Sequence, residues 1–122
     1  MDKRKELKLK YKQTWKRQGV YCFKNTKNGK VLIGPSQDLS RVENRIRFEL
    51  RTKASYFTSL QEDWNAMGPD VFEFSVLEEV KEKPENPDFD YDFAVENILE
   101  KYLEEYQPYG DKGYNHYKKD PS

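Results

Sequence analysis

The chain has 122 residues, of which nine are Tyr, seven Phe and two Trp, and its 22 basic side chains balance 22 acidic ones. This length corresponds to about one domain, and the aromatic content is too high for a disordered chain. No run approaches the roughly 18 apolar residues of a membrane helix, and the single cysteine, Cys22, excludes an internal disulfide. These features predict a soluble cytoplasmic protein with no membrane association.

The zero net charge is the sum of segments with opposite signs. Residues 1–18 carry eight basic against two acidic side chains, net +6, and residues 19–68 carry eight against five, net +3. Residues 69–107 carry three basic against thirteen acidic side chains, net −10, and residues 108–122 carry three against two, net +1. A basic first half is suited to a phosphate backbone, but charge alone also fits a set of solvated faces.

The first predicted element is a Lys-rich helix over residues 1–17, because three apolar residues recur there at helical spacing: Leu7, Tyr11 and Trp15. Its apolar stripe is thin. We therefore expect residues 1–18 to form a basic helical extension that packs on the main domain.

A β-hairpin follows. Residues 19–25 and 30–34 are strand-like and are joined at Asn28-Gly29, a dipeptide typical of two-residue hairpin loops because both residues accept positive φ. Such a loop pairs Phe23 with Gly34. Strand alternation then places three side chains on one face: Tyr21, Phe23 and Leu32.

The remaining elements are helices and one further strand. Asp38 is the predicted N-cap of the next helix, and an acidic, Pro-containing loop at 81–92 precedes the last helix. The predicted ranges are 38–52 (helix), 57–66 (helix), 71–77 (strand) and 92–107 (helix). This order is typical of a small α+β domain with a three-stranded antiparallel or mixed sheet flanked by helices. We expect that domain to span residues 19–115, with a C-terminal tail at 116–122.

Two short strand motifs carry a resemblance to a known family. Gly19-Val20-Tyr21 is followed after ten residues by Leu32-Ile33-Gly34, and this pair is similar to the signature of the GIY-YIG nuclease superfamily. The similarity continues in order along the chain, in segments at 24–26, 28–31, 59–65, 72–78, 99–102 and 113–115. Over about residues 19–115 the chain therefore resembles a small stand-alone member of bacterial or phage type.

The resemblance implies a catalytic surface over the sheet, where one divalent ion, Mg²⁺ or Mn²⁺, assists the hydrolysis of DNA phosphodiester bonds. Tyr21 matches the first signature tyrosine, Glu100 the glutamate that holds the ion, and Asn115 a late asparagine that supports the site. The chemistry is consistent, because a metal ion stabilises charge on the phosphoryl oxygens and Mg²⁺ accepts a single carboxylate together with waters.

Three positions depart from the family pattern. The second signature tyrosine is Leu32, the arginine position eight residues after Gly34 is Val42, and the assisting His or Tyr position is Ile46. These side chains neither exchange a proton nor bind phosphate. Arg45 lies about 60° around the helix from Val42 and is the preferred substitute for the arginine, with ordinary helix-surface basicity as its alternative.

Two functions involving nucleic acid stay open at this point, besides a third, a structural or phage accessory protein. The first is a metal-dependent endonuclease of weakened activity, in which Tyr21, Arg45 and Asn115 act on DNA and Glu100 holds the ion. The second is a catalytically inactive module that binds nucleic acid or a protein partner through basic residues at 3–17 and 41–53. Losing one catalytic group commonly costs several kcal/mol of transition-state stabilisation, so the altered positions favour weak or absent cleavage.

Each candidate residue also has a purely structural interpretation. Tyr21 would then be a core aromatic side chain, Glu100 part of a solvated helix edge, and Asn115 a cap or turn residue. His116, the sole histidine, is interpreted as a surface residue.

Overall fold

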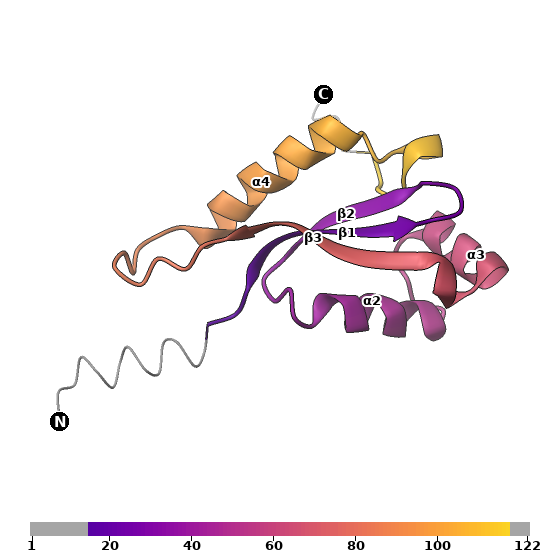
Figure 1. Cartoon of the computed structure of the whole chain (residues 1–122), viewed down its shortest axis with the longest axis horizontal. Helices are drawn as coiled ribbons and strands as arrows, with labels where there is room; N and C mark the ends of the chain where they lie inside the picture. Colours follow the sequence, from indigo (N-terminus) through magenta and orange to yellow (C-terminus); the bar gives the residue numbers. More distant parts are fainter. Residues whose placement is uncertain (1–14, 118–122) are drawn as a thin grey trace.

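The computed structural model describes residues 15–117, in which a three-stranded sheet carries helices on both faces (Figure 1). Both strand pairs are antiparallel, in the order β2-β1-β3. The predicted α+β class is confirmed, and the sheet is antiparallel rather than mixed. The elements are β1 (Gln18–Asn25), β2 (Val31–Ser36), α2 (Val42–Arg51), α3 (Thr58–Met67), β3 (Phe72–Val80) and α4 (Tyr91–Tyr106), with 3-10 turns at Pro69–Val71 and Gly110–Lys112.

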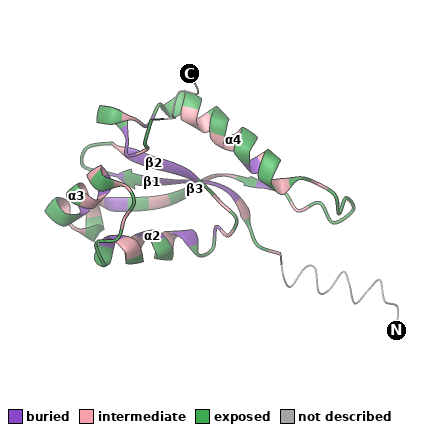
Figure 2. Ribbon diagram, turned by 180° about the vertical axis from the view of Figure 1, so that it is seen from behind, coloured by how far each residue is buried: buried purple, intermediate pink, exposed green. Residues whose placement is uncertain are grey.

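Helices cover both faces of the sheet (Figures 1 and 2), and a hydrophobic layer lies on each face. On one face, α2 and α3 pack on side chains that include Tyr21, Phe23 and Leu32, so the predicted shared face of these three residues is confirmed. On the other face, α4 packs on a layer that includes Val20 and Cys22. Because β1 is the central strand, its alternating residues serve both layers.

The turn between β1 and β2 is wider than predicted. Gly34 pairs with Tyr21 rather than with Phe23, which is a shift of the register by two residues. The Asn25 side chain accepts a hydrogen bond from the backbone N–H of Lys27 at 2.9 Å, and this contact stabilises a longer loop than Asn-Gly alone would form. A shift of two residues leaves every side chain on its predicted face.

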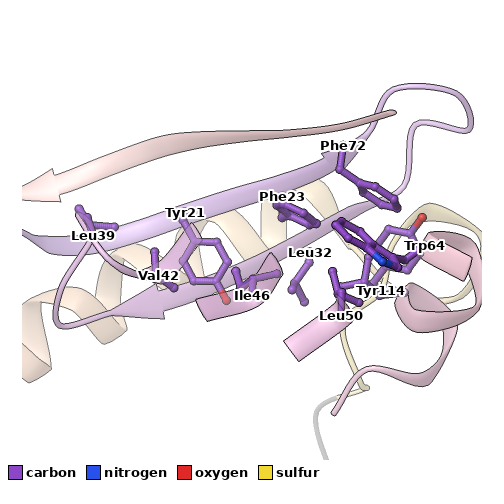
Figure 3. Packing of buried hydrophobic residues seen from close by; sticks show 11 residues of the cluster. Tyr21, Phe23, Leu32, Leu39, Val42, Ile46, Leu50, Trp64, Phe72 and Tyr114 are labelled. Atoms are coloured by element: carbon purple, nitrogen blue, oxygen red, sulfur yellow. The ribbon is translucent and has the colours of Figure 1, made fainter. Parts of the chain in front are cut away.

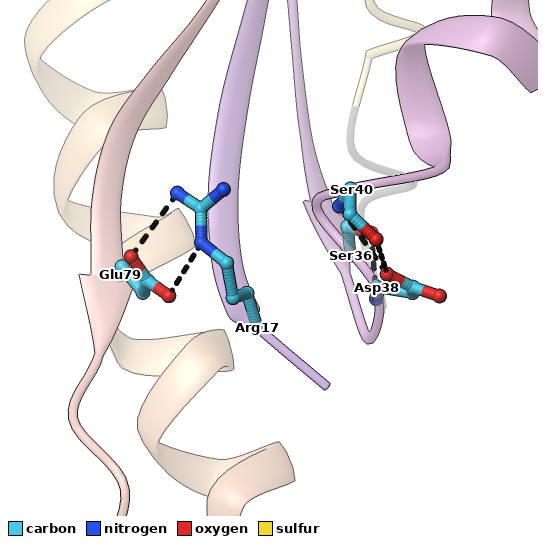
Figure 4. Close-up of polar contacts among 5 residues, drawn as sticks. All are labelled: Arg17, Ser36, Asp38, Ser40 and Glu79. Atoms are coloured by element: carbon cyan, nitrogen blue, oxygen red, sulfur yellow. Dashed lines mark hydrogen bonds and ion pairs between the residues drawn. The ribbon is translucent and has the colours of Figure 1, made fainter. Parts of the chain in front are cut away.

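The helix predicted directly after Asp38 starts later, at Val42. The Asp38 carboxylate accepts hydrogen bonds from the Ser40 hydroxyl at 2.6 Å and the Ser40 N–H at 3.2 Å, and the Ser36 hydroxyl accepts from the Asp38 N–H at 3.0 Å (Figure 4). These contacts favour local turns over helix. The Ser40 hydroxyl bond also lowers the pKa of the Asp38 carboxyl.

The helix predicted over residues 1–17 lies mostly outside the described residues. Residues 15–17 are not helical, and they lead directly into β1. The Arg17 guanidinium pairs with the Glu79 carboxylate at 2.9 Å (Figure 4), which ties this lead-in segment to β3. Within residues 15–117, no helix has both the length and the apolar character needed to cross a membrane.

The other predicted elements differ little from the observed ones. The helices α3 and α4 each lie within one residue of the predicted ranges. The strand β3 continues to Val80, three residues beyond its predicted end. Its additional residues extend the pairing with β1 to Gln18.

Candidate functional site

The two signature glycines occupy positions where a side chain would collide with a neighbouring strand. A Cβ atom on Gly34 would lie 2.6 Å from the hydroxyl oxygen of Tyr21, so the tyrosine ring lies directly over this residue. A Cβ atom on Gly19 would collide with the backbone carbonyl of Glu78, close to the shift in the β1–β3 register between Val20 and Tyr21. Gly19 is therefore required by the backbone of the sheet, whereas Gly34 is required by the position of the Tyr21 ring.

Tyr21 is enclosed by hydrophobic side chains (Figure 3). It is 6% exposed, its ring stacks on Phe74 with 5.8 Å between centroids, and it shares one cluster with Leu32, Val42 and Ile46. Burial raises the pKa of its phenol to about 12. At neutral pH this hydroxyl stays protonated, which makes it a poor base for activating a water molecule.

Arg45 is the candidate residue that the structure brings together with Tyr21. Its positive charge acts on the Tyr21 phenol, where it opposes the effect of burial on that pKa. The Arg45 side chain is 70% exposed, and its Nε atom lies 3.7 Å from Oε1 of Glu49. Glu49 also acts on the Tyr21 phenol and has no counterpart in the sequence motifs, although its spacing of four residues from Arg45 would have indicated the pair.

A hollow beside the first turn of α2 is lined by basic side chains. Lys16, Arg41 and Arg45 surround it, together with residues 35–38 and Val42. Arg41 approaches Asp38 with 3.7 Å between Nε and Oδ2. Because this pair and the Arg45–Glu49 pair are long and solvent-exposed, each is weak. An anion could therefore compete for both guanidinium groups.

Glu100 lies on α4, which covers the sheet face opposite to the one that Tyr21 enters. It is exposed and lines a hollow with Leu103, Glu104, Gln107 and Tyr109. The carboxylates of Glu100 and Glu104 are oxygen ligands of the type that Mg²⁺ and Mn²⁺ accept. Within residues 15–117, however, no group of three or more His, Cys, Asp or Glu side chains is arranged to hold a metal ion.

Asn115 lies beside the outer edge of β2, where its amide mimics a neighbouring strand. Its Oδ1 accepts a hydrogen bond from the backbone N–H of Ile33 at 2.9 Å. Its Nδ2 donates to the backbone carbonyl of the same residue at 2.7 Å. Because both groups of the amide are engaged by one peptide unit, Asn115 holds the C-terminal segment against the signature strand.

The candidate residues thus fall into three places. Tyr21 and Arg45 lie on the α2 face, Asn115 lies at the edge of β2, and Glu100 lies on the α4 face. The positions that the resemblance assigns to polar groups on the α2 face are filled by hydrophobic side chains. The accessible charged groups there include Arg41 and Arg45, which are weakly paired with Asp38 and Glu49.

The fold, with its paired glycine motifs, is similar to that of small nuclease catalytic domains. The structure is similar to the catalytic domain of the homing endonuclease I-TevI, with a TM-score of 0.66, 27% sequence identity, and coverage of 83% of this chain and 99% of that chain. It is equally similar to a mutant of the catalytic domain of the intron endonuclease I-TevI, with a TM-score of 0.66, 27% identity, and coverage of 81% and 92%.

I-TevI is a GIY-YIG homing endonuclease, and these likenesses support the GIY-YIG superfamily for this chain. No family model matches the sequence, and a search of curated proteins finds no match.

Proposed function

We propose that this chain binds DNA through its GIY-YIG fold and does not cut it by the superfamily's usual scheme. The observation that carries the proposal is the enclosure of Tyr21 by Leu32, Val42 and Ile46. At each of these three positions the resemblance implies a polar side chain. Here all three belong to the hydrophobic layer instead.

This enclosure works against cleavage for a direct chemical reason. Hydrolysis of a phosphodiester needs an activated water and positive charge around the phosphoryl oxygens. Leu32 offers no proton or hydrogen bond to a water, and Val42 and Ile46 offer no charge. Tyr21 itself has a pKa raised to about 12, so its hydroxyl stays protonated at neutral pH. Removing one such group from an active site commonly costs several kcal/mol, and here three positions are altered together.

DNA binding does not need these groups. Phosphate contacts from Lys and Arg supply most of the sequence-independent affinity of proteins for DNA. The hollow at the start of α2 presents Lys16, Arg41 and Arg45 on one surface. Arg41 and Arg45 are paired only weakly, with Asp38 and Glu49, and Asp38 keeps its hydrogen bonds to Ser40 when its pair with Arg41 opens. A phosphate backbone would therefore replace both ion pairs at small cost.

A metal-dependent endonuclease is the second candidate, and the likeness to I-TevI catalytic domains favours it. In that case Glu100 would hold one Mg²⁺ or Mn²⁺, and the bound ion would stabilise negative charge on the scissile phosphate. Tyr21 would position a water molecule and Arg45 would contact a phosphate, but both lie on the sheet face opposite to the one that carries Glu100. Asn115 would keep the edge of β2 in place.

Two measurements on the same protein test the proposal. The first is the affinity for a fluorescent DNA duplex as a function of salt, where the three cations predict a slope of about −3 in log K against log[salt]. The second is nicking of a supercoiled plasmid with Mg²⁺ or Mn²⁺. We expect salt-sensitive binding and no nicking. Nicking that Glu100→Ala abolishes and Glu105→Ala preserves would instead establish the second candidate.

A matched pair of variants checks where the DNA binds. Arg45→Ala is expected to weaken duplex binding and to reduce the salt slope by about 0.9. Lys81→Ala removes an exposed cation that follows β3, and it is expected to leave the slope unchanged. Equal effects of the two substitutions would contradict a site at α2.

A further inference from the structure

Aromatic side chains gather on the surface next to the outer edge of β2, and of these only Tyr109 was named above, in the hollow of Glu100. The rings of Tyr56 and His116 lie 4.5 Å apart between centroids, and His116 also lies 5.1 Å from Phe57. The next residue, Tyr117, stacks on Tyr109 at 5.2 Å with an interplanar angle of 19°. We call these five residues the aromatic patch. Its two outer members, Tyr56 and Tyr117, are each 73% exposed.

The backbone on both sides of the patch is held in place. Asn115, directly before His116, is fixed to Ile33 by two hydrogen bonds. On the other side, the Ser55 hydroxyl accepts a hydrogen bond from the Phe57 N–H at 3.2 Å, and α3 begins at the next residue. A single exposed aromatic side chain needs no explanation. The patch consists of two groups of rings, Tyr56–Phe57–His116 and Tyr109–Tyr117, which are joined through the adjacent residues 116 and 117. On anchored backbone this arrangement forms a preorganised surface.

The charges next to the patch indicate what this surface would contact. On the Tyr56 side, the segment at residues 51–57 contains Arg51 and Lys53, both exposed, and no acidic side chain. On the Tyr109 side, Glu100 and Glu104 line a hollow with that ring, so the cations adjoin the Tyr56 side alone. Arg51 ends α2, the helix that also carries Arg45. Exposed ring faces beside cations are the combination by which proteins bind single-stranded nucleic acid, since bases stack on the rings while phosphates contact the cations.

We propose that the aromatic patch stacks the unpaired bases of a DNA strand, so that the DNA bound by this chain includes a single-stranded segment. The inference rests on the DNA binding proposed above and adds the class of DNA. A continuous duplex keeps its base faces covered by neighbouring base pairs, and therefore does not present them to Tyr56 and Tyr117. The cations of α2 would contact phosphates of both kinds of DNA.

The test compares two DNA probes and two kinds of exposed aromatic residue. The probes are a fluorescent oligothymidylate of about ten nucleotides and a blunt duplex of the same length, with affinities measured by fluorescence anisotropy. Tyr56→Ala and Tyr117→Ala are each expected to weaken oligothymidylate binding at least about fivefold, and to change duplex binding by less than about twofold. Tyr56→Phe keeps the ring and is expected to bind like the wild type.

Phe93→Ala is the matched control, because Phe93 is 61% exposed in the first turn of α4, at the opposite end of that helix from Tyr109. It is expected to leave both affinities unchanged, and thermal unfolding checks that every variant is folded. Oligothymidylate binding that Tyr56→Ala and Tyr117→Ala leave intact overturns the inference, while duplex binding sensitive to Arg45→Ala still upholds the proposed function. An equal loss with both probes also overturns stacking. A wild-type protein that binds neither probe overturns the inference and the proposed function together.

Discussion

Gly34→Ala probes the packing that defines the candidate site, because it adds one methyl group below the ring of Tyr21. The new Cβ atom would lie 2.6 Å from the hydroxyl oxygen, 2.8 Å from Cζ and 3.1 Å from Cε1 of Tyr21. The ring has little room to move, since it stacks on Phe74 and contacts the side chains of α2. Overpacking of this kind typically costs about 1–3 kcal/mol, so we expect a loss of that size in the free energy of unfolding measured with urea.

A double-mutant cycle separates this clash from other effects of alanine in a strand. In the background of Tyr21→Ala the ring is absent, and Gly34→Ala should then be neutral or stabilising by up to about 1 kcal/mol, because alanine restricts the unfolded chain. The coupling between the two positions should therefore amount to about 1–3 kcal/mol. If Gly34→Ala were as stable as the wild type, or equally costly in both backgrounds, the placement of Tyr21 over Gly34 would be refuted.

Two further predictions concern the hydroxyl of Tyr21 and the amide of Asn115. Because burial raises the pKa of Tyr21 to about 12 from an unfolded value of about 10, its contribution to stability is complete below pH 10 and is lost as the pH rises to 12. Between pH 10 and 12 the Tyr21→Phe variant should therefore lose about 2 kcal/mol less unfolding free energy than the wild type. An equal loss in both proteins would contradict the burial of the Tyr21 hydroxyl. Asn115→Ala leaves the buried N–H and carbonyl of Ile33 without their partners and should cost about 1–3 kcal/mol in urea unfolding. Asn115→Asp should cost at least as much, because a carboxylate would then face the Ile33 carbonyl, and a smaller loss would argue against the two-bond contact.

The elements of the fold could be predicted from the sequence because their patterns are local. The alternation in β1 and β2 placed Tyr21 and Leu32 on one face, and the structure confirms it. The apolar spacing of α4 gave its range to within one residue. The exact register of the hairpin was wrong because it depends on the Asn25 side chain, which closes a longer loop than the Asn-Gly dipeptide indicates.

The start of α2 was misplaced for a similar reason. Asp38 has the composition of an N-cap, but its carboxylate is engaged by Ser40, and the sequence does not show which local hydrogen bond is preferred. The arrangement of the site was harder to predict, because it depends on contacts between distant segments. Motif matching alone did not place Glu100 and Tyr21 on opposite sides of the sheet, and it did not show that both groups of the Asn115 amide contact Ile33.

The clearest indication of function in the sequence came from the hydrophobic residues at positions where the family pattern has polar ones. Val42 and Ile46 recur at the spacing of a buried helix face, and the structure packs both around Tyr21. The aromatic patch gave no such signal, since Tyr56 and His116 are sixty residues apart in the sequence and meet only in the folded chain.

The central claim, a DNA-binding GIY-YIG fold without strand cleavage, is tested most directly by one plasmid assay. Supercoiled DNA is incubated with a saturating excess of the wild-type protein and with Mg²⁺ or Mn²⁺, and the same mixture is analysed for complex formation and for nicked circles. We expect a salt-sensitive complex in which the plasmid stays supercoiled. Nicked or linear DNA that requires the metal ion and disappears with Glu100→Ala would contradict the claim.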